Sequence, residues 1–301
     1  MWKLFRLILV IALLFFIGSQ VAGRVHIGLP GMLGGAPADG YASPHIYMTE
    51  RGSGKIAYAK EAEAKAFPAS LTKVMTVLVA LEHIDDLSAA APVDVETYQR
   101  MVAVNASMAG FYGRERVTYR DLLYGTMLPS GGEAANSLAV HIAGSPAKFA
   151  GLMNEKAAAI GMTGTHFVNP EGLHDPQQYT TAADMAKLLD HALDNRDFRA
   201  IFTRGQFQTT ATADHPGGLL LRSTVLSSLA GAEQPGFEIL GGKSGTTYEA
   251  GQCWATLAAI GDSEFITVVM GAPLGDISKP DFAHRQDTLT LLSEAAAGRL
   301  K

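Results

Sequence analysis

The chain has 301 residues, of which 48% are hydrophobic and 18% charged, an ordinary composition for a globular protein with a large core. A formal net charge of −5, with no basic run interleaved with aromatic residues, argues against nucleic acid as a partner. The single cysteine, Cys253, excludes an intramolecular disulfide. Scattered histidines without zinc-like spacing predict no metal site; these include His141, His166, His174 and His191.

The first 23 residues have the organisation of a secretory signal. Lys3 and Arg6 precede an apolar run over residues 7–17, and small residues follow at 21–23. The pattern predicts cleavage after Gly23, and an uncleaved membrane anchor is the alternative. In either case we expect the rest of the chain outside the cytoplasm, secreted or associated with the cell wall or membrane. Any membrane attachment is expected through this segment alone.

The next part of the chain predicts a linker followed by one domain. Residues 24–40 are rich in glycine and proline, whereas residues 41–301 contain no second linker and no repeat. Residues 43–48 and 55–60 predict two strands joined by a glycine-containing turn. A helix follows from Ser70, and it is apolar on nearly every face, which is typical of a buried central helix.

The middle of the chain is predicted to be mainly helical. Helices are expected after the capping boxes Thr118-x-x-Asp121 and Thr181-x-x-Asp184, over residues 133–141, and over residues 147–160 up to Gly161. The last third predicts strands and a closing helix, at residues 238–243, 252–260, 265–271 and 281–296. Runs of strands separated from runs of helices indicate an α+β fold, with an antiparallel sheet formed by the N- and C-terminal segments.

The first candidate site is Ser70-Leu71-Thr72-Lys73 at the start of the central helix. Residues three apart share a helix face, so the Lys73 amine can reach the Ser70 hydroxyl. A serine is a weak nucleophile that needs a neighbouring base, and burial would push the lysine toward its neutral form. Alone, the motif is better explained by an ordinary N-terminal helix cap.

Two further motifs add hydroxyl and ammonium groups. Ser130 lies in the small-residue turn Ser130-Gly131-Gly132 between two helices, where it can relay a proton or simply cap the next helix. Lys243 offers a fixed positive charge for a substrate carboxylate, beside the hydroxyls of Ser244 and Thr246, and Gly245 lets a ligand approach the backbone closely. A glycine-rich edge strand is the alternative explanation of this last motif.

Together, in this order, the three motifs resemble those of the serine penicillin-binding proteins and β-lactamases. The sequence is most similar to the low-molecular-weight D-alanyl-D-alanine carboxypeptidases, over about Tyr41 to Met270. The similar segments are residues 122–125, 127–135, 166–173, 180–186 and 243–251. The resemblance implies a β-lactamase/transpeptidase-like fold. It also implies that the enzyme removes the terminal D-alanine from peptidoglycan stem peptides without a cofactor, with β-lactam antibiotics as covalent inhibitors.

The resemblance also implies roles for individual residues. Ser70 is the acyl-accepting nucleophile, Lys73 its base and Ser130 the proton relay to the leaving amine. The substrate-binding residues are Lys243, Ser244, Gly245 and Thr246, with the backbone N–H groups of Ser70 and Thr246 as the oxyanion hole. The longer members of the family have a further β-rich domain and a C-terminal amphipathic anchor. We expect neither here, since the chain ends with the predicted terminal helix.

Two positions depart from the family pattern. Gly132 stands where asparagine is usual, which affects substrate positioning more than activation of the nucleophile. Ser244 replaces threonine and keeps the hydroxyl. Three alternatives remain open: a β-lactamase with Glu171 as its deacylating base, a penicillin-binding relative without catalysis, and an endopeptidase. Glu171 is otherwise expected to be an exposed residue of a turn.

Two remaining features are interpreted as structural. Cys253 lies beside Trp254 in an apolar strand pattern, which favours an inert packing residue over a cysteine nucleophile. Residues 105–107 match a glycosylation sequon, which we interpret as chance.

Overall fold

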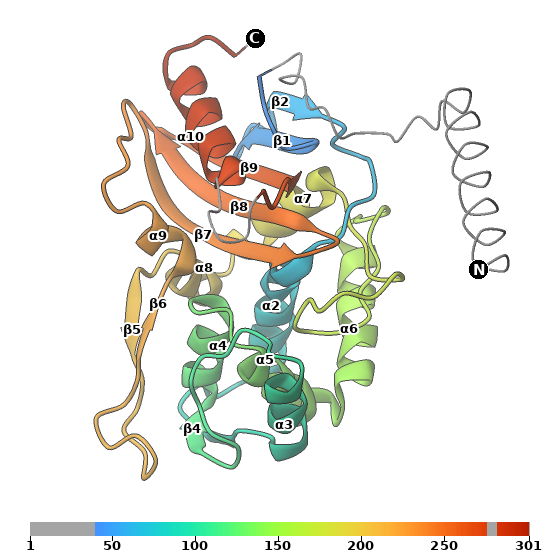
Figure 1. Ribbon diagram of the computed structural model, residues 1–301, viewed down its shortest axis with the longest axis vertical. Coiled ribbons are helices and arrows are strands. Elements are labelled where there is room, and N and C mark those ends of the chain that lie inside the picture. The colour runs from blue at the N-terminus through green and yellow to red at the C-terminus, as the bar shows by residue number, and fades with distance from the viewer. Residues whose placement is uncertain (1–39, 276–281, 301) are drawn as a thin grey trace, which may run out of the picture. The chain divides into compact units, whose positions relative to one another are not determined.

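An antiparallel sheet of five strands, in the order β2-β1-β9-β8-β7, forms the centre of the computed structural model (Figure 1). The model describes residues 40–275 and 282–300. The strands are β1 His45–Glu50, β2 Ile56–Lys60, β7 Glu238–Thr247, β8 Gly251–Ile260 and β9 Ser263–Ala272. β1 pairs with β9 along its whole length, from His45 opposite Met270 to Glu50 opposite Phe265. The expected α+β fold, with one sheet shared by the two ends of the chain, is therefore confirmed.

Both faces of the sheet are covered, because successive side chains of a strand point to opposite sides. In β8, Cys253, Ala255 and Leu257 belong to one buried apolar cluster. Trp254 and Ala258 of the same strand belong to the other. Strands buried on both faces have continuous apolar runs rather than strict alternation, which explains the apolar sequence of β8.

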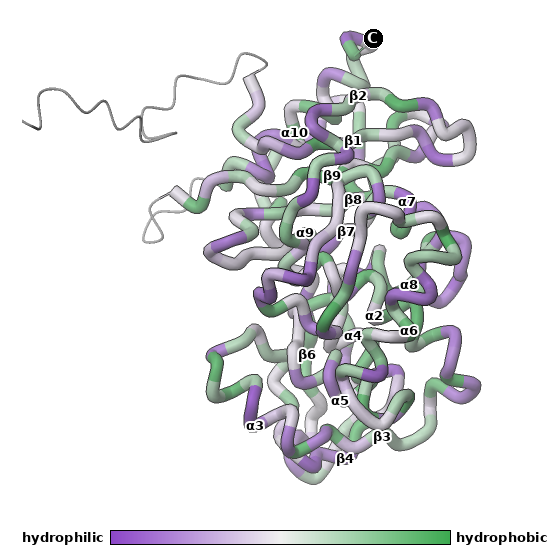
Figure 2. Tube along the Cα trace, turned by 90° about the vertical axis from the view of Figure 1, so that its right-hand side faces the viewer, coloured by the Kyte–Doolittle hydropathy of each residue, from purple (hydrophilic) through white to green (hydrophobic). Residues whose placement is uncertain are grey.

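One face is covered by α10 (Ala283–Ala296) and the short helix α9 (Thr224–Ser228), whose Val225 lies in the same buried cluster as Trp254. A group of helices covers the other face. α10 packs on β8 and β9, whereas α7 (Ala182–Leu193) packs against β1 and β9. α2 (Lys73–His83) runs through the interior between α7 and the other helices, as Figure 1 shows. Eight of its eleven residues are buried, which confirms the predicted central helix. Hydrophobic residues recur along the helices around it (Figure 2).

The helical middle of the chain packs around α2. It contains α3 Val95–Ala103, α4 Tyr119–Met127, α5 Gly132–Ala143, α6 Pro146–Ala159 and α8 Arg196–Phe202. The shorter elements are the 3-10 turn Ala69–Thr72, α9 Thr224–Ser228, and two two-stranded antiparallel sheets. One sheet pairs Ala90–Pro92 (β3) with Arg116–Thr118 (β4), and the other pairs Gln206–Gln208 (β5) with Leu220–Arg222 (β6). α3, α8, α9 and these two small sheets were not predicted from the sequence, because they are short and lack a long apolar repeat.

Local signals account for several helix ends. Thr118 and Asp121 form a complete capping box at the start of α4, as predicted. The Thr181 side chain caps α7 by accepting the Asp184 N–H. Gly161, just beyond α6, has a φ of +77° and ends the helix in the left-handed region that glycine tolerates.

The first strand begins later than predicted. We expected it over residues 43–48, but β1 starts at His45. The Ser43 N–H and hydroxyl both donate to the Asp287 carboxylate of α10, at 2.7 and 2.6 Å. These hydrogen bonds direct Ser43 toward the helix rather than into the sheet ladder.

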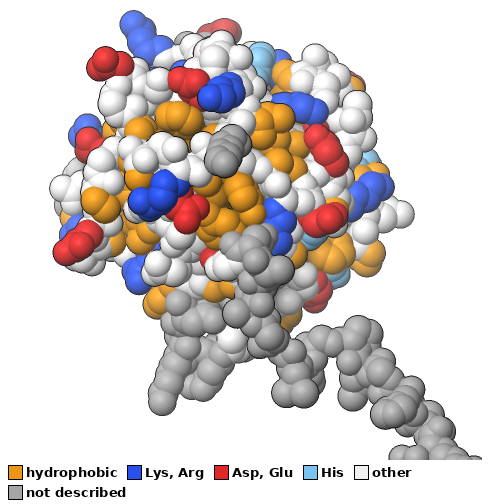
Figure 3. Space-filling view, turned by 90° about the horizontal axis from the view of Figure 1, so that it is seen from above, with side chains coloured by type: hydrophobic (Ala, Val, Ile, Leu, Met, Phe, Trp, Pro, Cys, Tyr) orange, Lys and Arg blue, Asp and Glu red, His pale blue; other side chains and the backbone are white. Residues whose placement is uncertain are grey.

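The surface carries charged side chains of both signs. The view from above shows Lys and Arg side chains interspersed with Asp and Glu (Figure 3). Within the part of the chain that the structure describes, no helix has both the length and the apolar character to cross a membrane. The predicted signal over residues 1–23, most of the linker over 24–40, and the predicted first residue of the closing helix, Asp281, lie outside the described residues.

Candidate active site

The structure places Ser70 and Lys73 side by side at the start of α2. Ser70 lies in the 3-10 turn that leads directly into the helix, and the Lys73 Nζ donates to its Oγ at 3.1 Å. The same amine donates to the backbone carbonyl of Glu171. Lys73 is 2% exposed, and this burial lowers its pKa to about 8, although the nearby Glu171 and Glu133 oppose the shift. The amine is therefore neutral in about a tenth of the molecules at pH 7, a far larger fraction than for an ordinary lysine.

The turn before Ser70 is sterically demanding. Ala69 has a φ of +45°, in the left-handed region that a residue with a side chain rarely occupies. Gly172 lies against it, and a Cβ at Gly172 would be 2.0 Å from the Ala69 carbonyl oxygen. Only glycine permits this approach between the loop and the nucleophile turn. The close contact holds the backbone of Glu171 next to Lys73.

Ser130 and Lys243 form a second hydroxyl–amine pair. Ser130 lies between α4 and α5 with a φ of +68°, and the Lys243 Nζ donates to its Oγ at 2.9 Å. Lys243 also donates to the Ser244 carbonyl at 2.7 Å. Its burial, and then the nearby Lys73, lower its pKa well below the usual value for lysine. The sequence analysis expected a fixed positive charge here; the structure instead gives an amine whose protonation depends on its surroundings.

Gly245 brings β7 against the nucleophile turn. A Cβ on Gly245 would lie 2.9 Å from the Ser70 nitrogen and 3.1 Å from the Leu71 nitrogen. Any side chain at this position would push the strand away from the start of α2. The predicted close approach at Gly245 therefore exists, and its first partner is the protein's own backbone around Ser70.

A cavity of about 130 Å³ lies beside the pair of Ser70 and Lys73. It is also lined by Thr246, and by Gly132 and Glu171, whose effect on the site was considered from the sequence. The remaining lining residues had no expected role: Asn105, Ala106, Ser107, Gly172, Leu173 and Thr247. The expectation that Glu171 is exposed is wrong, because its side chain is only 4% exposed. The loop folds inward because its glycine packs under the nucleophile turn.

The loop over residues 105–107 takes the space in front of Gly132. The Gly132 N–H donates to the Ser107 carbonyl at 2.7 Å. A Cβ at Gly132 would lie 2.9 Å from the Met101 sulfur and 3.3 Å from the Ser107 oxygen. The family's usual asparagine would therefore not fit here without movement of α3 or of this loop.

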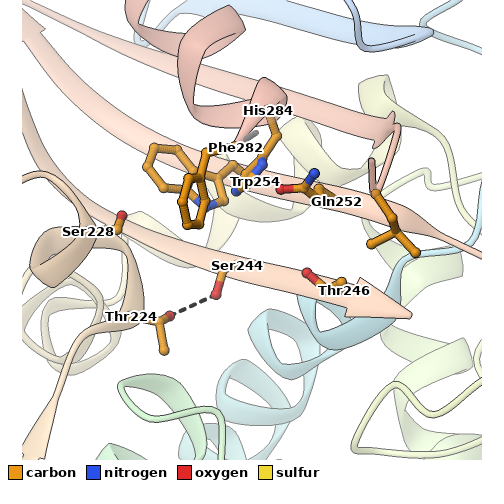
Figure 4. A pocket seen from close by; sticks show the side chains of 9 residues that line it. Thr224, Ser228, Ser244, Thr246, Gln252, Trp254, Phe282 and His284 are labelled. Atoms are coloured by element: carbon orange, nitrogen blue, oxygen red, sulfur yellow. Dashed lines mark hydrogen bonds between the residues drawn. The ribbon is translucent and has the colours of Figure 1, made fainter. Parts of the chain in front are cut away.

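Ser244 faces a separate pocket on the other side of β7, of about 350 Å³ (Figure 4). The Ser244 hydroxyl lies 2.7 Å from that of Thr224. Trp254, Phe282 and His284 form the opposite wall in Figure 4. Thr246 lines both this pocket and the Ser70 cavity. The structure thus brings Ser70, Lys73, Ser130, Lys243, Gly245 and Thr246 together, whereas the Ser244 side chain lies in the adjoining pocket.

No described residues form a cluster of three or more histidine, cysteine, aspartate or glutamate side chains able to bind a metal ion. Cys253 is fully buried within β8, and burial raises the pKa of its thiol to about 12. Such a thiol does not form the thiolate that a cysteine nucleophile needs. In the cavity, the Ser70 hydroxyl instead has the buried Lys73 amine within hydrogen-bonding distance.

Comparison with known proteins agrees with this arrangement. The model of the D-alanyl-D-alanine carboxypeptidase family matches residues 35–274. The D-alanyl-D-alanine carboxypeptidase of Streptomyces sp. strain K15 is 31% identical, over 80% of this chain and 87% of its own length. The carboxypeptidase DacC of Escherichia coli is 33% identical over 75% of this chain. DacF of Bacillus subtilis is 29% identical, also over 75% of this chain. The chain spans only 55% of DacC and 56% of DacF.

Solved structures give the same result. The crystal structure of the Streptomyces K15 DD-transpeptidase superposes with a TM-score of 0.73 at 28% identity, covering 88% of this chain and all of that one. A penicillin-binding protein homologue from Mycobacterium tuberculosis has the same TM-score and identity, over 87% of this chain and 95% of its own. The predicted transpeptidase-like fold is thereby confirmed. The chain belongs to the D-alanyl-D-alanine carboxypeptidase family of peptidases.

Proposed function

We propose that this protein is a serine-type carboxypeptidase that removes the terminal D-alanine from peptidoglycan stem peptides. The main support is the convergence of two hydroxyl–amine pairs, Ser70 with Lys73 at 3.1 Å and Ser130 with Lys243 at 2.9 Å. A weak nucleophile, a base with a lowered pKa and a proton relay are the parts that acyl transfer through serine requires. Membership of the carboxypeptidase family provides the substrate class.

The proposed acylation follows from these contacts. Neutral Lys73 takes the Ser70 proton as the oxygen attacks the carbonyl of the penultimate D-alanine. Ser130 passes a proton to the leaving amine, and Lys243, hydrogen-bonded to its hydroxyl, stabilises the charge that develops there. The backbone N–H groups of Ser70 and Thr246 form the oxyanion hole, and loss of one such donor typically costs about 100- to 1,000-fold in rate. Water then hydrolyses the acyl-enzyme.

The terminal carboxylate of the substrate is assigned to the β7 residues Lys243 and Thr246. Burial lowers the pKa of Lys243 in the empty site. An arriving carboxylate favours the protonated amine, since an opposite charge nearby stabilises the ammonium. Lys243 would thus become charged when the substrate binds.

The first experiment measures D-alanine release from diacetyl-lysyl-D-alanyl-D-alanine by the chain from Arg24 onward. Ser70→Ala is the matched control, and intact-mass spectra are recorded with penicillin. Release that depends on Ser70, together with a long-lived penicilloyl adduct, is the expected result. Rapid loss of the adduct would identify a β-lactamase. An adduct without release would identify a non-catalytic relative or an endopeptidase, and a relative from Pseudomonas aeruginosa is named D-alanyl-D-alanine endopeptidase. The absence of both the adduct and D-alanine release would refute the assignment.

The proposed site of action is outside the cytoplasm, where peptidoglycan lies. The support is the signal-like pattern of residues 1–23 and the family membership. Fractionation of cells that express the full chain, followed by mass analysis of its N-terminus, tests both export and cleavage after Gly23. A protein that is retained whole in the cytoplasm would contradict this part of the proposal.

A further inference from the structure

Glu171 brings a buried carboxyl group to the cavity of the nucleophile. Its side chain is 4% exposed, and the residue lines the same cavity as Ser70 and Lys73. The Oε2 atom is buried and accepts no hydrogen bond from any residue that the structure describes. Buried polar atoms without protein partners are rare, and they commonly bind an ordered water. The loop is fixed in place, because Lys73 donates to the Glu171 carbonyl and the Gly172 N–H donates to Asn169.

The charges around Glu171 come from two elements. On α3, the Arg100 guanidinium lies 3.7 Å from the other carboxyl oxygen, Oε1, and is half exposed. On α2, the Lys73 amine is close enough that each group shifts the pKa of the other. Burial raises the pKa of Glu171, whereas Arg100 and Lys73 oppose the shift. A carboxylate whose pKa is raised toward the working pH is a better general base.

We propose that Glu171 binds and deprotonates the water that hydrolyses the acyl-enzyme. This inference rests on the proposed function. The water proton moves to the Glu171 carboxylate as the hydroxide oxygen bonds to the acyl carbon of the Ser70 ester. The bond between that carbon and the Ser70 oxygen then breaks. The proton returns from Glu171 to the Ser70 oxygen through the Lys73 amine, which is hydrogen-bonded to it. The products are a free serine and a peptide carboxylic acid, which ionises in solvent.

The alternative is that Glu171 is only a structural partner of Arg100 or a charge that tunes Lys73. The two steps of the reaction separate these roles. A residue that acts through Lys73 changes acylation, because Lys73 is the base for that step. A residue that activates the hydrolytic water changes deacylation alone.

The test variant is Glu171→Gln, which keeps the shape and removes the base. We expect acylation by penicillin to stay within about threefold of the parent, while hydrolysis of the peptidyl-enzyme slows by about 100-fold or more, the usual contribution of a general base. With the D-alanyl-D-alanine peptide, the variant should release one equivalent of D-alanine and then stop. Intact-mass spectra should show the peptidyl-enzyme accumulating.

Glu133→Gln is the matched control. Glu133 is also buried and also shifts the pKa of Lys73, but it does not line the cavity. Its Oε1 accepts the N–H groups of Ala109 and Gly110 at 2.7 and 3.0 Å, contacts that glutamine preserves. We expect this control to leave the ratio of deacylation to acylation unchanged. Arg100→Gln removes the ion pair with Glu171 and the 2.7 Å hydrogen bond to the Asn136 Oδ1. It should retain deacylation at high pH, with the acid limb moved upward because Glu171 loses a neighbouring cation.

A pH profile of the parent tests the inference without any variant that might misfold. The acid limb of deacylation should follow Glu171 and differ from that of acylation, which follows Lys73. Equal slowing of both steps in Glu171→Gln, or unchanged deacylation, would overturn the inference. A parent that forms no acyl-enzyme at all would instead overturn the proposed function, so the two failures are distinguishable.

Discussion

Gly132 stands where asparagine is usual in the family pattern, and adding a side chain there should destabilise the protein. In Gly132→Ala, the new Cβ would be 2.9 Å from the sulfur and 3.3 Å from the Cγ of Met101, which is fully buried. Overpacking of this kind typically costs about 1–3 kcal/mol. The gain from replacing glycine within a helix offsets about 0.5–1 kcal/mol. The expected net loss is therefore about 1–2 kcal/mol.

Gly151→Ala is the matched control, because Gly151 lies inside α6 with nothing within 4 Å of its added Cβ. It should raise the free energy of unfolding by about 0.5–1 kcal/mol. Denaturant titration and thermal melting of both variants give the comparison, at roughly 2–4 °C per kcal/mol for a domain of this size. Gly132→Asn should be worse than Gly132→Ala and should not raise activity. If Gly132→Ala is as stabilising as Gly151→Ala, the packing argument at Met101 is refuted.

Three further outcomes follow from the site and its supports. Acylation by penicillin should accelerate as pH rises, with a midpoint near 8, because burial lowers the pKa of Lys73 and only the neutral amine accepts a proton. Lys73→Arg, which stays charged, should abolish the step. A rate of acylation that does not depend on pH would contradict this role. Gly245→Ala should slow acylation by about 100-fold while the protein stays folded, since the added Cβ lies 2.9 Å from the Ser70 nitrogen. Stopped-flow measurements give the acylation rate, and circular dichroism reports on folding. An unchanged rate would show that β7 tolerates the displacement. Asp121→Ala should lower the free energy of unfolding by about 2 kcal/mol, because it removes the capping box of α4 and the acceptor for the Thr210 N–H at 3.0 Å. Denaturant titration measures this loss. A loss under about 0.5 kcal/mol would refute the expectation.

The sequence alone was sufficient for the long elements and the chemical groups of the site. Three features could be predicted from the sequence because they depend only on residues that are close together in it. They are the apolar repeat after Ser70, the capping box at Thr118 and the apolar run of β8. The three motifs identified Ser70, Lys73, Ser130 and the β7 residues because acyl transfer needs those groups. The short elements α3 and α8 were missed, since too few residues contribute to any period.

Only the tertiary structure decided the state of these groups. Burial is a property of the packed chain, and it made Lys243 an amine of lowered pKa rather than a permanent cation. It also placed Glu171 inside the cavity, because Gly172 packs beneath Ala69, about a hundred positions earlier in the sequence. The sequence thus determined which groups are present and in which elements they lie. Contacts between distant segments set their distances, exposure and pKa values, because desolvation and van der Waals contact depend on neighbours in space.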